Sequence, residues 1–334
     1  KMFAGKSFHA IELEKNPQLE LDYIVAPPRM ALYIEYSTRI YNIYLKYIAP
    51  EDIHVYSIDE SFIDITDYLK LYKMNARAMA RLLIKEILEQ KGIPSTVGIG
   101  TNLYLAKIAL DITAKHSSSH IGFLTEEIYR EKLWKHRPIT DFWQVAKGTA
   151  ARLSKYGIYD MEGVAKAPQE LLYKEFGINA ELLIDHAWGY EPTTIAEIKK
   201  YKPQNNSLST GQVLQNPYTA DKAKLIVKEM TDLLVLDLVD KKLVTDQMVL
   251  TIGYDIDNLT DPVIRSKYHG EITTDRYGRQ VPKHAHGTIN LSCQTSSTKI
   301  IMKAVEELFD RIINWDLLVR RINVVASRVV RKYL

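Results

Sequence analysis

The stretch IHVYSIDESFIDIT, residues 53–66, alternates apolar and polar side chains on each side of an acidic pair. This period of two predicts a strand, a tight turn and a second strand, with Asp59 and Glu60 at the tip of the hairpin. An ionised carboxylate in a half-buried setting needs a partner. Mg²⁺ suits that role, because it prefers hard oxygen ligands and is often held by one or two carboxylates and substrate phosphates. The alternative is a solvated turn that happens to contain Asp-Glu.

The segments around this hairpin favour an α+β layer. Apolar residues at three- and four-residue steps predict helices over 30–47 and 76–90, and Asn102 is a plausible N-cap for a helix to about 114. Residues 95–100 predict a short strand, and residues 1–28 look irregular, with Asn16-Pro17 and Pro27-Pro28 as breakers. This order predicts helices on one face of a mainly antiparallel sheet.

The rest of the chain predicts further domains and therefore an α+β multidomain protein. Residues 117–122 read as a loop, 125–190 as short helices, and 191–206 as a linker without an apolar period. Residues 207–334 predict two helices (219–239 and 298–313) packed on one sheet of four strands, which begin near 207, 245, 286 and 317. Within them, the polar stretch 256–285 predicts a long hairpin or a flexible insertion.

A second stretch that could carry chemistry is VGIGTNLYLAKIALD, residues 97–111. Gly98 and Gly100 end a strand just before a helix, but the third glycine of a dinucleotide fingerprint is missing. Lys107 lies beside an apolar helix face. Such a lysine is usually solvated, and the alternative is a cation that reaches a triphosphate at the edge of the sheet.

Composition excludes several classes of protein. With 46% apolar and 25% charged residues the chain is not intrinsically disordered. It has no apolar run of the length that spans a membrane, and residues 1–6 lack the core of a signal peptide. The single cysteine, Cys293, excludes a disulfide framework and a cysteine zinc finger, which favours a reducing, cytoplasmic location. The net charge of +3 is too small to indicate a nucleic-acid partner by itself.

Taken together, YSIDESFIDIT (56–66) and VGIGTNLYLAKIALD (97–111), supported by PPRMALYIEYSTRI (27–40), resemble the Y-family (translesion) DNA polymerases, in the bacterial UmuC-like, UV-damage repair branch. The resemblance implies a polymerase right hand. Its parts would be a remnant of the finger region (1–28), a palm with a helix-covered sheet (29–120), a helical thumb (121–190), a linker (191–206) and a DNA-binding little finger (207–334) with the polar insertion 256–285.

The resemblance also implies an activity, which is template-directed synthesis of DNA past damaged bases in DNA repair and the SOS response. The primer 3′-hydroxyl would attack the α-phosphate of a dNTP and pyrophosphate would leave, with two Mg²⁺ ions about 3.5–4 Å apart. Asp59 and Glu60 would be catalytic metal ligands, and Glu60 would hold the ion that activates the hydroxyl. Lys107 and Lys1 would contact the nucleotide. Partners would be primer–template DNA and dNTP, and also a sliding clamp, although no clamp-binding motif follows residue 334.

Five basic residues are candidates for contact with DNA. By the resemblance the last strand would hold the template backbone. Simple alternation along that strand places Arg320 and Arg321 on opposite faces, so at most one would face DNA. The alternative for these arginines is an ordinary exposed sheet face. The candidates are Lys147, Arg152, Arg320, Arg321 and Arg328.

Two departures from the family pattern leave alternatives open. The family's palm opens with a strand that carries another metal-binding aspartate, followed by the aromatic residue that excludes ribonucleotides, and this sequence appears without that segment. The thumb hairpin normally has a Gly-hydrophobic-Gly motif, whereas this chain has WQVAKG at 143–148. The protein could therefore be a catalytically incomplete DNA-binding homologue. A palm-type nucleotidyl cyclase is a third reading, which the thumb and the C-terminal domain oppose.

Other acidic and histidine residues have plainer explanations. Asp64 and Asp67 fit the end of a strand or the cap of a turn better than a metal site. His284 and His286 could ligate a metal, but a solvated hairpin accounts for them better because no third ligand is near in sequence.

Overall fold

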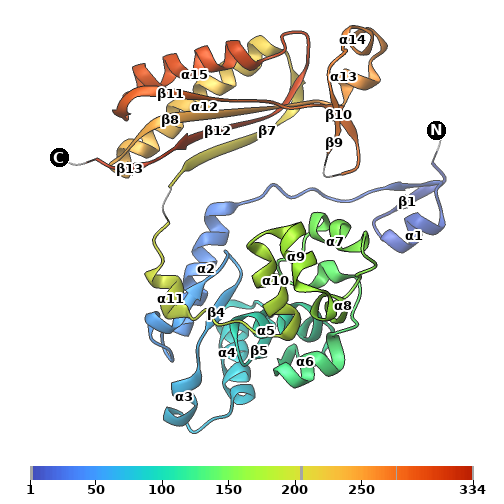
Figure 1. Cartoon of the computed structure of the whole chain (residues 1–334), viewed down its shortest axis with the longest axis vertical. Helices are drawn as coiled ribbons and strands as arrows, with labels where there is room; N and C mark the ends of the chain where they lie inside the picture. The colour runs from blue at the N-terminus through green and yellow to red at the C-terminus, as the bar shows by residue number, and fades with distance from the viewer. Residues whose placement is uncertain (1–2, 204–205, 276, 333–334) are drawn as a thin grey trace. The chain divides into compact units, whose positions relative to one another are not determined.

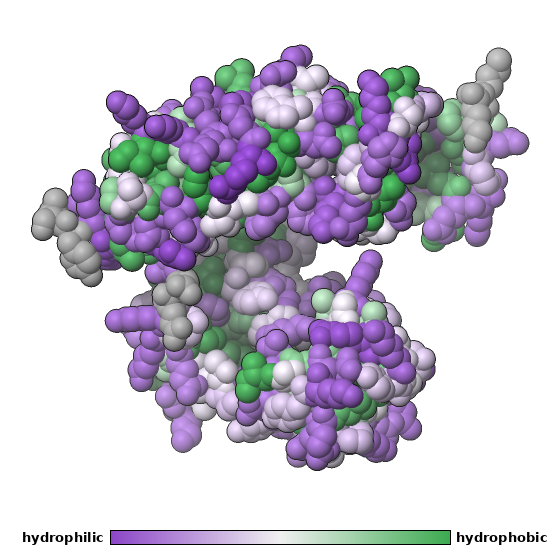
Figure 2. Space-filling model, turned by 45° about the horizontal axis from the view of Figure 1, so that its top comes forward, coloured by the Kyte–Doolittle hydropathy of each residue, from purple (hydrophilic) through white to green (hydrophobic). Residues whose placement is uncertain are grey.

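The computed structural model describes residues 3–203, 206–275 and 277–332. The chain forms two compact units, with the boundary between Tyr201 and Lys202. Both units mix helices and strands (Figure 1). None of the helices in the described ranges is long and apolar enough to cross a membrane, and hydrophilic groups cover most of the surface visible in Figure 2.

The N-terminal segment is more regular than its sequence indicates. Strands β1 (Gly5–Ser7) and β2 (Leu19–Leu21) pair in parallel, and helix α1 (Ala10–Lys15) connects them. The expectation of an irregular 1–28 is therefore wrong, because β1 (GKS) has no apolar residue and leaves no periodic signal. Helix α2 (Met30–Tyr44) follows, and its regular turns end three residues before the expected limit.

The acidic hairpin forms as expected. Strands β3 (Ile53–Val55) and β4 (Ser61–Ile63) are antiparallel, and the turn between them contains Asp59 and Glu60. Helices α3 (Thr66–Leu71) and α4 (Ala76–Lys91) come next, and α4 begins at Asn75, whose side chain accepts a hydrogen bond from the Ala78 N–H. Asp64 follows β4 directly and closes a turn, because its Oδ1 accepts from the backbone N–H and the hydroxyl of Thr66, as the interpretation of a turn residue expects.

Strand β5 (Val97–Gly100) pairs in parallel with β6 (Ile121–Leu124), and these two strands form a ladder separate from β3–β4. The expected mainly antiparallel sheet is thus wrong here, as is the loop at 117–122, which overlaps β6. Between the strands run helix α5 (Leu103–Ile108), a π turn (Ala109–Thr113) and a 3₁₀ turn (Ala114–His116). The chain therefore makes a helical crossover, the connection that parallel strands require.

Five short helices follow, as the sequence predicts: α6 (Glu126–Leu133), α7 (Lys147–Ser154), α8 (Met161–Lys166), α9 (Gln169–Phe176) and α10 (Asn179–Trp188). Their core is continuous with α5, because Tyr104 and Leu105 are buried among Tyr129, Phe142 and Leu153. Residues 191–206, expected to lack regular structure, contain helix α11 (Ile195–Lys200). A capping box between Thr194 and Glu197 starts this helix, and its Ile195 is buried.

The C-terminal unit is a sheet covered on one side by two helices (Figure 1). The strands are β7 (Leu208–Tyr218), β8 (Leu243–Tyr254), β11 (Ala285–Thr295) and β12 (Val319–Ser327), in the antiparallel order β11-β8-β12-β7, and β13 (Val330–Arg331) pairs with the start of β8. Helices α12 (Ala220–Asp240) and α15 (Thr298–Ile312) bury alternate strand residues such as Leu250 and Ile322. The prediction of two helices on four main strands is confirmed.

The polar stretch 256–285 is a structured insertion. It contains helices α13 (Asp257–Thr260) and α14 (Pro262–Lys267) and a hairpin of β9 (Ile272–Thr274) and β10 (Gln280–Pro282). The hairpin was expected and the two helices were not. Asn258 anchors the insertion, since its buried amide donates to the carbonyls of Asp255 and Leu318 and accepts from the Leu318 N–H.

Candidate active site

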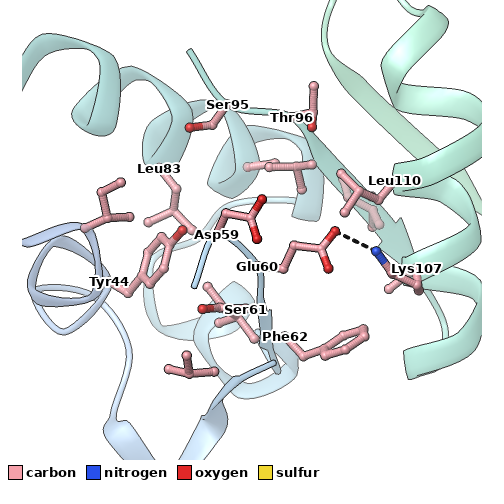
Figure 3. A pocket seen from close by; sticks show the side chains of 18 of the residues that line it. Tyr44, Asp59, Glu60, Ser61, Phe62, Leu83, Ser95, Thr96, Lys107 and Leu110 are labelled. Atoms are coloured by element: carbon pink, nitrogen blue, oxygen red, sulfur yellow. Dashed lines mark hydrogen bonds and ion pairs between the residues drawn. The ribbon is translucent and has the colours of Figure 1, made fainter. Parts of the chain in front are cut away.

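The tight turn at 57–60 determines where its two carboxylates point. The backbone N–H groups of Tyr56 and Ser57 both donate to the Glu60 carbonyl, at 3.0 and 3.1 Å, and the Ser57 hydroxyl donates to Asp59 Oδ1 at 2.7 Å. Figure 3 shows Asp59 and Glu60 side by side, both directed into the same pocket. The sequence-predicted acidic pair is therefore a pair in space as well.

The pocket has a volume of about 1190 Å³ and lies within the N-terminal unit. Helices α2 and α4 form one wall, with Tyr44 and Leu83, and strands β4 and β5 with the start of α5 form the others. Gly98 and Gly100 contribute to this wall because they let the backbone of β5 pack directly against α5 and the turn that follows it. A Cβ at Gly100 would lie 2.2 Å from the Ala106 nitrogen, so α5 can approach β5 this closely only where the strand has glycine.

Lys107 is buried at the edge of this pocket and joins two carboxylates. Its Nζ lies 2.6 Å from Glu60 Oε1 and 3.1 Å from Asp111 Oδ2, and its side chain is 9% exposed. Burial alone would lower the pKa of Lys107, but the hydrogen bonds and charges of Glu60 and Asp111 outweigh it and raise the pKa. Lys107 is thus a fixed ammonium group, and the interpretation of it as a solvated surface lysine is wrong.

Aromatic residues from two parts of the chain complete the surroundings of Lys107. Its Nζ lies 5.9 Å from the centre of the Tyr56 ring, within the range of a cation–π contact. The Trp143 indole N–H donates to the Tyr56 hydroxyl at 3.0 Å, and both rings contact Phe62. Trp143 therefore links the helical segment to the acidic hairpin.

The donor set around the turn fits a divalent ion in part. No group of three or more His, Cys, Asp or Glu side chains placed to hold a metal occurs among the described residues. Asp59 and Glu60 supply two carboxylates, and the Lys107 ammonium on Glu60 shows that this position accommodates a cation. Two carboxylates with substrate phosphates and water are a donor set that Mg²⁺ commonly accepts.

Sequence reasoning missed several residues of this region. Asp111 contacts both Lys107 and, at 2.9 Å, Lys115, which also lines the pocket. The four-residue spacing of these three residues is visible in the sequence and could have identified them. A buried pair, His186 and Glu191, left no such signal. His186 Nε2 lies 2.9 Å from Glu191 Oε2, and its ring stacks on Tyr104 with centroids 4.0 Å apart.

Lys147 and Arg152, the two residues of the helical segment that are expected to contact DNA, lie in different environments. Lys147 is exposed at the first residue of α7. Arg152 is engaged within the segment, since it donates to the Glu175 carbonyl at 2.7 Å and its guanidinium lies 4.3 Å from the centre of the Phe176 ring. Gln144 lies in the stretch 143–148, where the family pattern has its Gly-hydrophobic-Gly motif. Its backbone is left-handed, with φ of 69°. Lys1 lies outside the described residues.

The arginines of β12 correct the prediction from simple alternation. The pairing of β12 with β8 shifts between Val319 and Arg321, which marks a β-bulge. Val319 and Ile322 are both fully buried, so the two arginines between them both lie off the core face and not on opposite faces. Arg320 donates to the Gln215 carbonyl at 2.7 Å, whereas Arg321 is exposed.

Two further predicted residue sets lie in the C-terminal unit. Arg328 is exposed, and its Nη1 lies 3.9 Å from Asp246 Oδ1. His286 pairs with Thr251 across the strands, with 2.9 Å between Nδ1 and Oγ1, and its ring centroid is 6.5 Å from that of His284. The described residues give these histidines no third metal ligand.

Comparisons with known proteins identify the family. The impB/mucB/samB family description matches residues 8–111, and the C-terminal domain of the same family matches residues 205–332. A Bacillus subtilis (strain 168) protein named for UV-damage repair, UvrX, is 31% identical over 258 residues, which are 77% of this chain and 59% of that protein. DNA polymerase IV 2 of the same organism is 33% identical over 61% of this chain and 47% of its own length.

A shorter relative is matched almost completely. The DNA repair protein homolog YobH of Bacillus subtilis (strain 168) is 32% identical over 60% of this chain and 93% of its own length. Among solved structures, a Y-family DNA polymerase chimera, Dbh-Dpo4(243-245)-Dbh, has a TM-score of 0.66 and 20% identity, and the match covers 92% of this chain and 79% of the chimera. The expected α+β multidomain class is confirmed: the chain belongs to the impB/mucB/samB family and has the fold of the Y-family DNA polymerases.

Proposed function

We propose that the protein is a template-directed DNA polymerase that inserts nucleotides opposite damaged bases. The observation that carries the proposal is the acidic turn, in which Asp59 and Glu60 face one pocket beside Lys107, in a chain with a Y-family fold. In this proposal residues 29–120 are the palm, 121–190 the thumb and 207–334 the little finger. The relatives named as polymerases, or for repair of UV damage, support the same activity.

The residues of the chain would bind the metal and position the substrates. Asp59 and Glu60 would hold two Mg²⁺ ions, which when bound neutralise charge on the triphosphate and activate the primer 3′-hydroxyl. The Ser57 hydroxyl holds the Asp59 carboxylate, and the backbone hydrogen bonds to the Glu60 carbonyl hold the turn, before substrate arrives, so that Asp59 needs little reorganisation. Primer–template DNA and dNTP would be the substrates, and by the family pattern a sliding clamp would be a partner.

The pocket suggests how the metal site is completed. In the described ranges β4 pairs with β3 alone and β5 with β6 alone, and the free edges of β4 and β5 both line the pocket. An extended segment entering there would pair with both edges, because an open strand edge is a template for another strand. If that segment carried a carboxylate, a third acidic ligand would lie beside Asp59 and Glu60. The aspartate on the opening palm strand has this role in the family pattern.

Primer extension tests the proposal against the alternative, a catalytically incomplete DNA-binding homologue. The full-length protein is incubated with a primer–template that carries a damaged base, Mg²⁺ and dNTP. We expect extension past the lesion, and its loss when EDTA removes the metal. A protein that binds this DNA tightly but adds no nucleotide, even to an undamaged template, would be a DNA-binding homologue and not a polymerase.

A further inference from the structure

A cation of the chain itself lies beside Glu60. The Lys107 ammonium is 2.6 Å from Glu60 Oε1, and both the lysine and the carboxylate belong to the pocket wall. Figure 3 shows this contact at the point where Glu60 and Asp59 lie side by side. Because the ammonium neutralises the Glu60 charge and occupies one of its two oxygens, a divalent ion meets the full negative charge of Glu60 only when that ammonium moves away.

The lysine has a second acceptor already in place. Asp111 lies one helical turn after Lys107, and its Oδ2 is 3.1 Å from Nζ. The Tyr56 ring offers its face to the same ammonium at 5.9 Å, and Trp143 holds that ring by its hydroxyl. Lys107 can therefore leave Glu60 by a small rotation of its terminal bonds and remain paired inside the protein.

We propose that Lys107 is a built-in competitor for the divalent metal at Glu60, and that Asp111 is the positioning residue that receives its ammonium when metal binds. The inference rests on the metal site of the proposed function. It explains why a lysine is buried against two carboxylates, since an ion pair of this kind neutralises Glu60 and orders the acidic turn before substrate arrives. Asp111 then sets the free energy needed to move the ammonium away from Glu60, and therefore the affinity for the metal.

Direct binding of Mn²⁺ to the protein without DNA or nucleotide, followed by the EPR signal of the free ion, tests this inference. Lys107→Met removes the competitor, and we expect the Kd for Mn²⁺ to fall about tenfold. Lys107→Gln is the second variant, in case Lys107→Met disturbs folding. It also removes the charge but keeps a polar end, and it should lower the Kd for Mn²⁺ as well. Lys115→Met is the matched control: it removes an equal charge from the other side of Asp111, where the lysine is 55% exposed, and should change Kd less than about twofold.

A double-mutant cycle tests the role of Asp111. Asp111→Asn should raise the Kd for Mn²⁺ several-fold, because the ammonium then has only Glu60 as a carboxylate partner. If Asp111 acts through Lys107, most of this effect disappears in the Lys107→Met background. Unchanged Mn²⁺ binding in both Lys107 variants, or an equal effect of Asp111→Asn with and without Lys107, would overturn the inference. Primer extension, which tests the polymerase proposal, is measured separately and can succeed in either case.

Discussion

At the scale of single residues, Gln144 occupies a backbone conformation that favours glycine, with φ of 69°. A side chain in the left-handed region costs about 1 kcal/mol or more. We predict that Gln144→Gly raises the free energy of unfolding by about 0.5–1 kcal/mol, because relief of this strain exceeds the added entropy of the unfolded chain. Denaturant unfolding measures the change. Gln169→Gly, at the first residue of α9, is the control and should be destabilising or neutral; an equal loss in both variants would contradict the explanation.

The buried His186–Glu191 pair predicts a loss of stability in acid. Burial holds the pKa of His186 below its ordinary value of 6.5. Burial alone would raise the pKa of Glu191, but hydrogen bonds from Thr193 and His186 outweigh it and lower that pKa. As the pH falls below about 6.5 the unfolded chain takes up a proton at His186 that the folded chain refuses, so the free energy of unfolding decreases, and Glu191 adds to the loss at lower pH.

This prediction is checked by thermal unfolding between pH values of about 7.5 and about 5.5. The double variant His186→Phe with Glu191→Gln keeps a ring against Tyr104 and removes both titrating groups. Its Tm should fall less over this range than that of the wild-type protein. A wild-type Tm that stays constant, or an identical fall in both proteins, would show that the pair does not govern the acid response.

At the scale of elements, the contact of α5 with β5 depends on glycine. Because a Cβ at Gly100 would lie 2.2 Å from the Ala106 nitrogen, we predict that Gly100→Ala destabilises the protein by at least about 2 kcal/mol. Gly148→Ala is the matched control. Apart from its chain neighbours and the backbone of its own helix, no atom lies within 4 Å of its added Cβ, and α7 should gain up to about 1 kcal/mol. Denaturant unfolding compares the two, and equal behaviour would mean that helix and strand can separate without cost.

Sequence patterns predicted the long amphipathic helices and the hairpin with alternating apolar residues. The hairpin around Asp59 and Glu60, the helix α4 and both helices of the C-terminal unit follow from periodicity, and the start of α5 follows from its cap Asn102, which accepts from the Leu105 N–H. Strands such as β1 (GKS) and β6 (IGFL) do not alternate apolar with polar residues, so periodicity does not detect them. The parallel pairing of β5 with β6 and the bulge at Arg320 arise from contacts between distant segments, which local pattern does not encode.

The candidate site was predictable to the same degree. Asp59, Glu60 and Lys107 stand out in the sequence, and the structure brings them together. The partners that give Lys107 its environment come from elsewhere in the chain, as Trp143 does through Tyr56. No spacing rule relates residues 56 and 143, since only tertiary packing makes them neighbours.

At the scale of the whole molecule, the proposed grip on DNA predicts a salt effect. Arg321 is exposed on β12, off the core face of the C-terminal sheet. We predict that Arg321→Gln weakens binding to all DNA sequences alike and lowers the slope of log K against log salt by about one. Lys303→Gln, on the exposed side of α15, is the control and should leave the slope unchanged. Fluorescence anisotropy at several salt concentrations measures this, and sequence-selective loss would argue against a backbone contact.

The central claim is that Asp59 and Glu60 hold the metal for nucleotide transfer. Its most direct measurement is the rate of single-nucleotide incorporation by the full-length protein with Mg²⁺, alongside the Kd for primer–template DNA. Asp59→Ala and Glu60→Ala should each reduce the rate at least about 100-fold and leave DNA binding within about twofold, whereas Asp67→Ala on α3 should change neither. Incorporation at the wild-type rate by either of the first two variants would contradict the account.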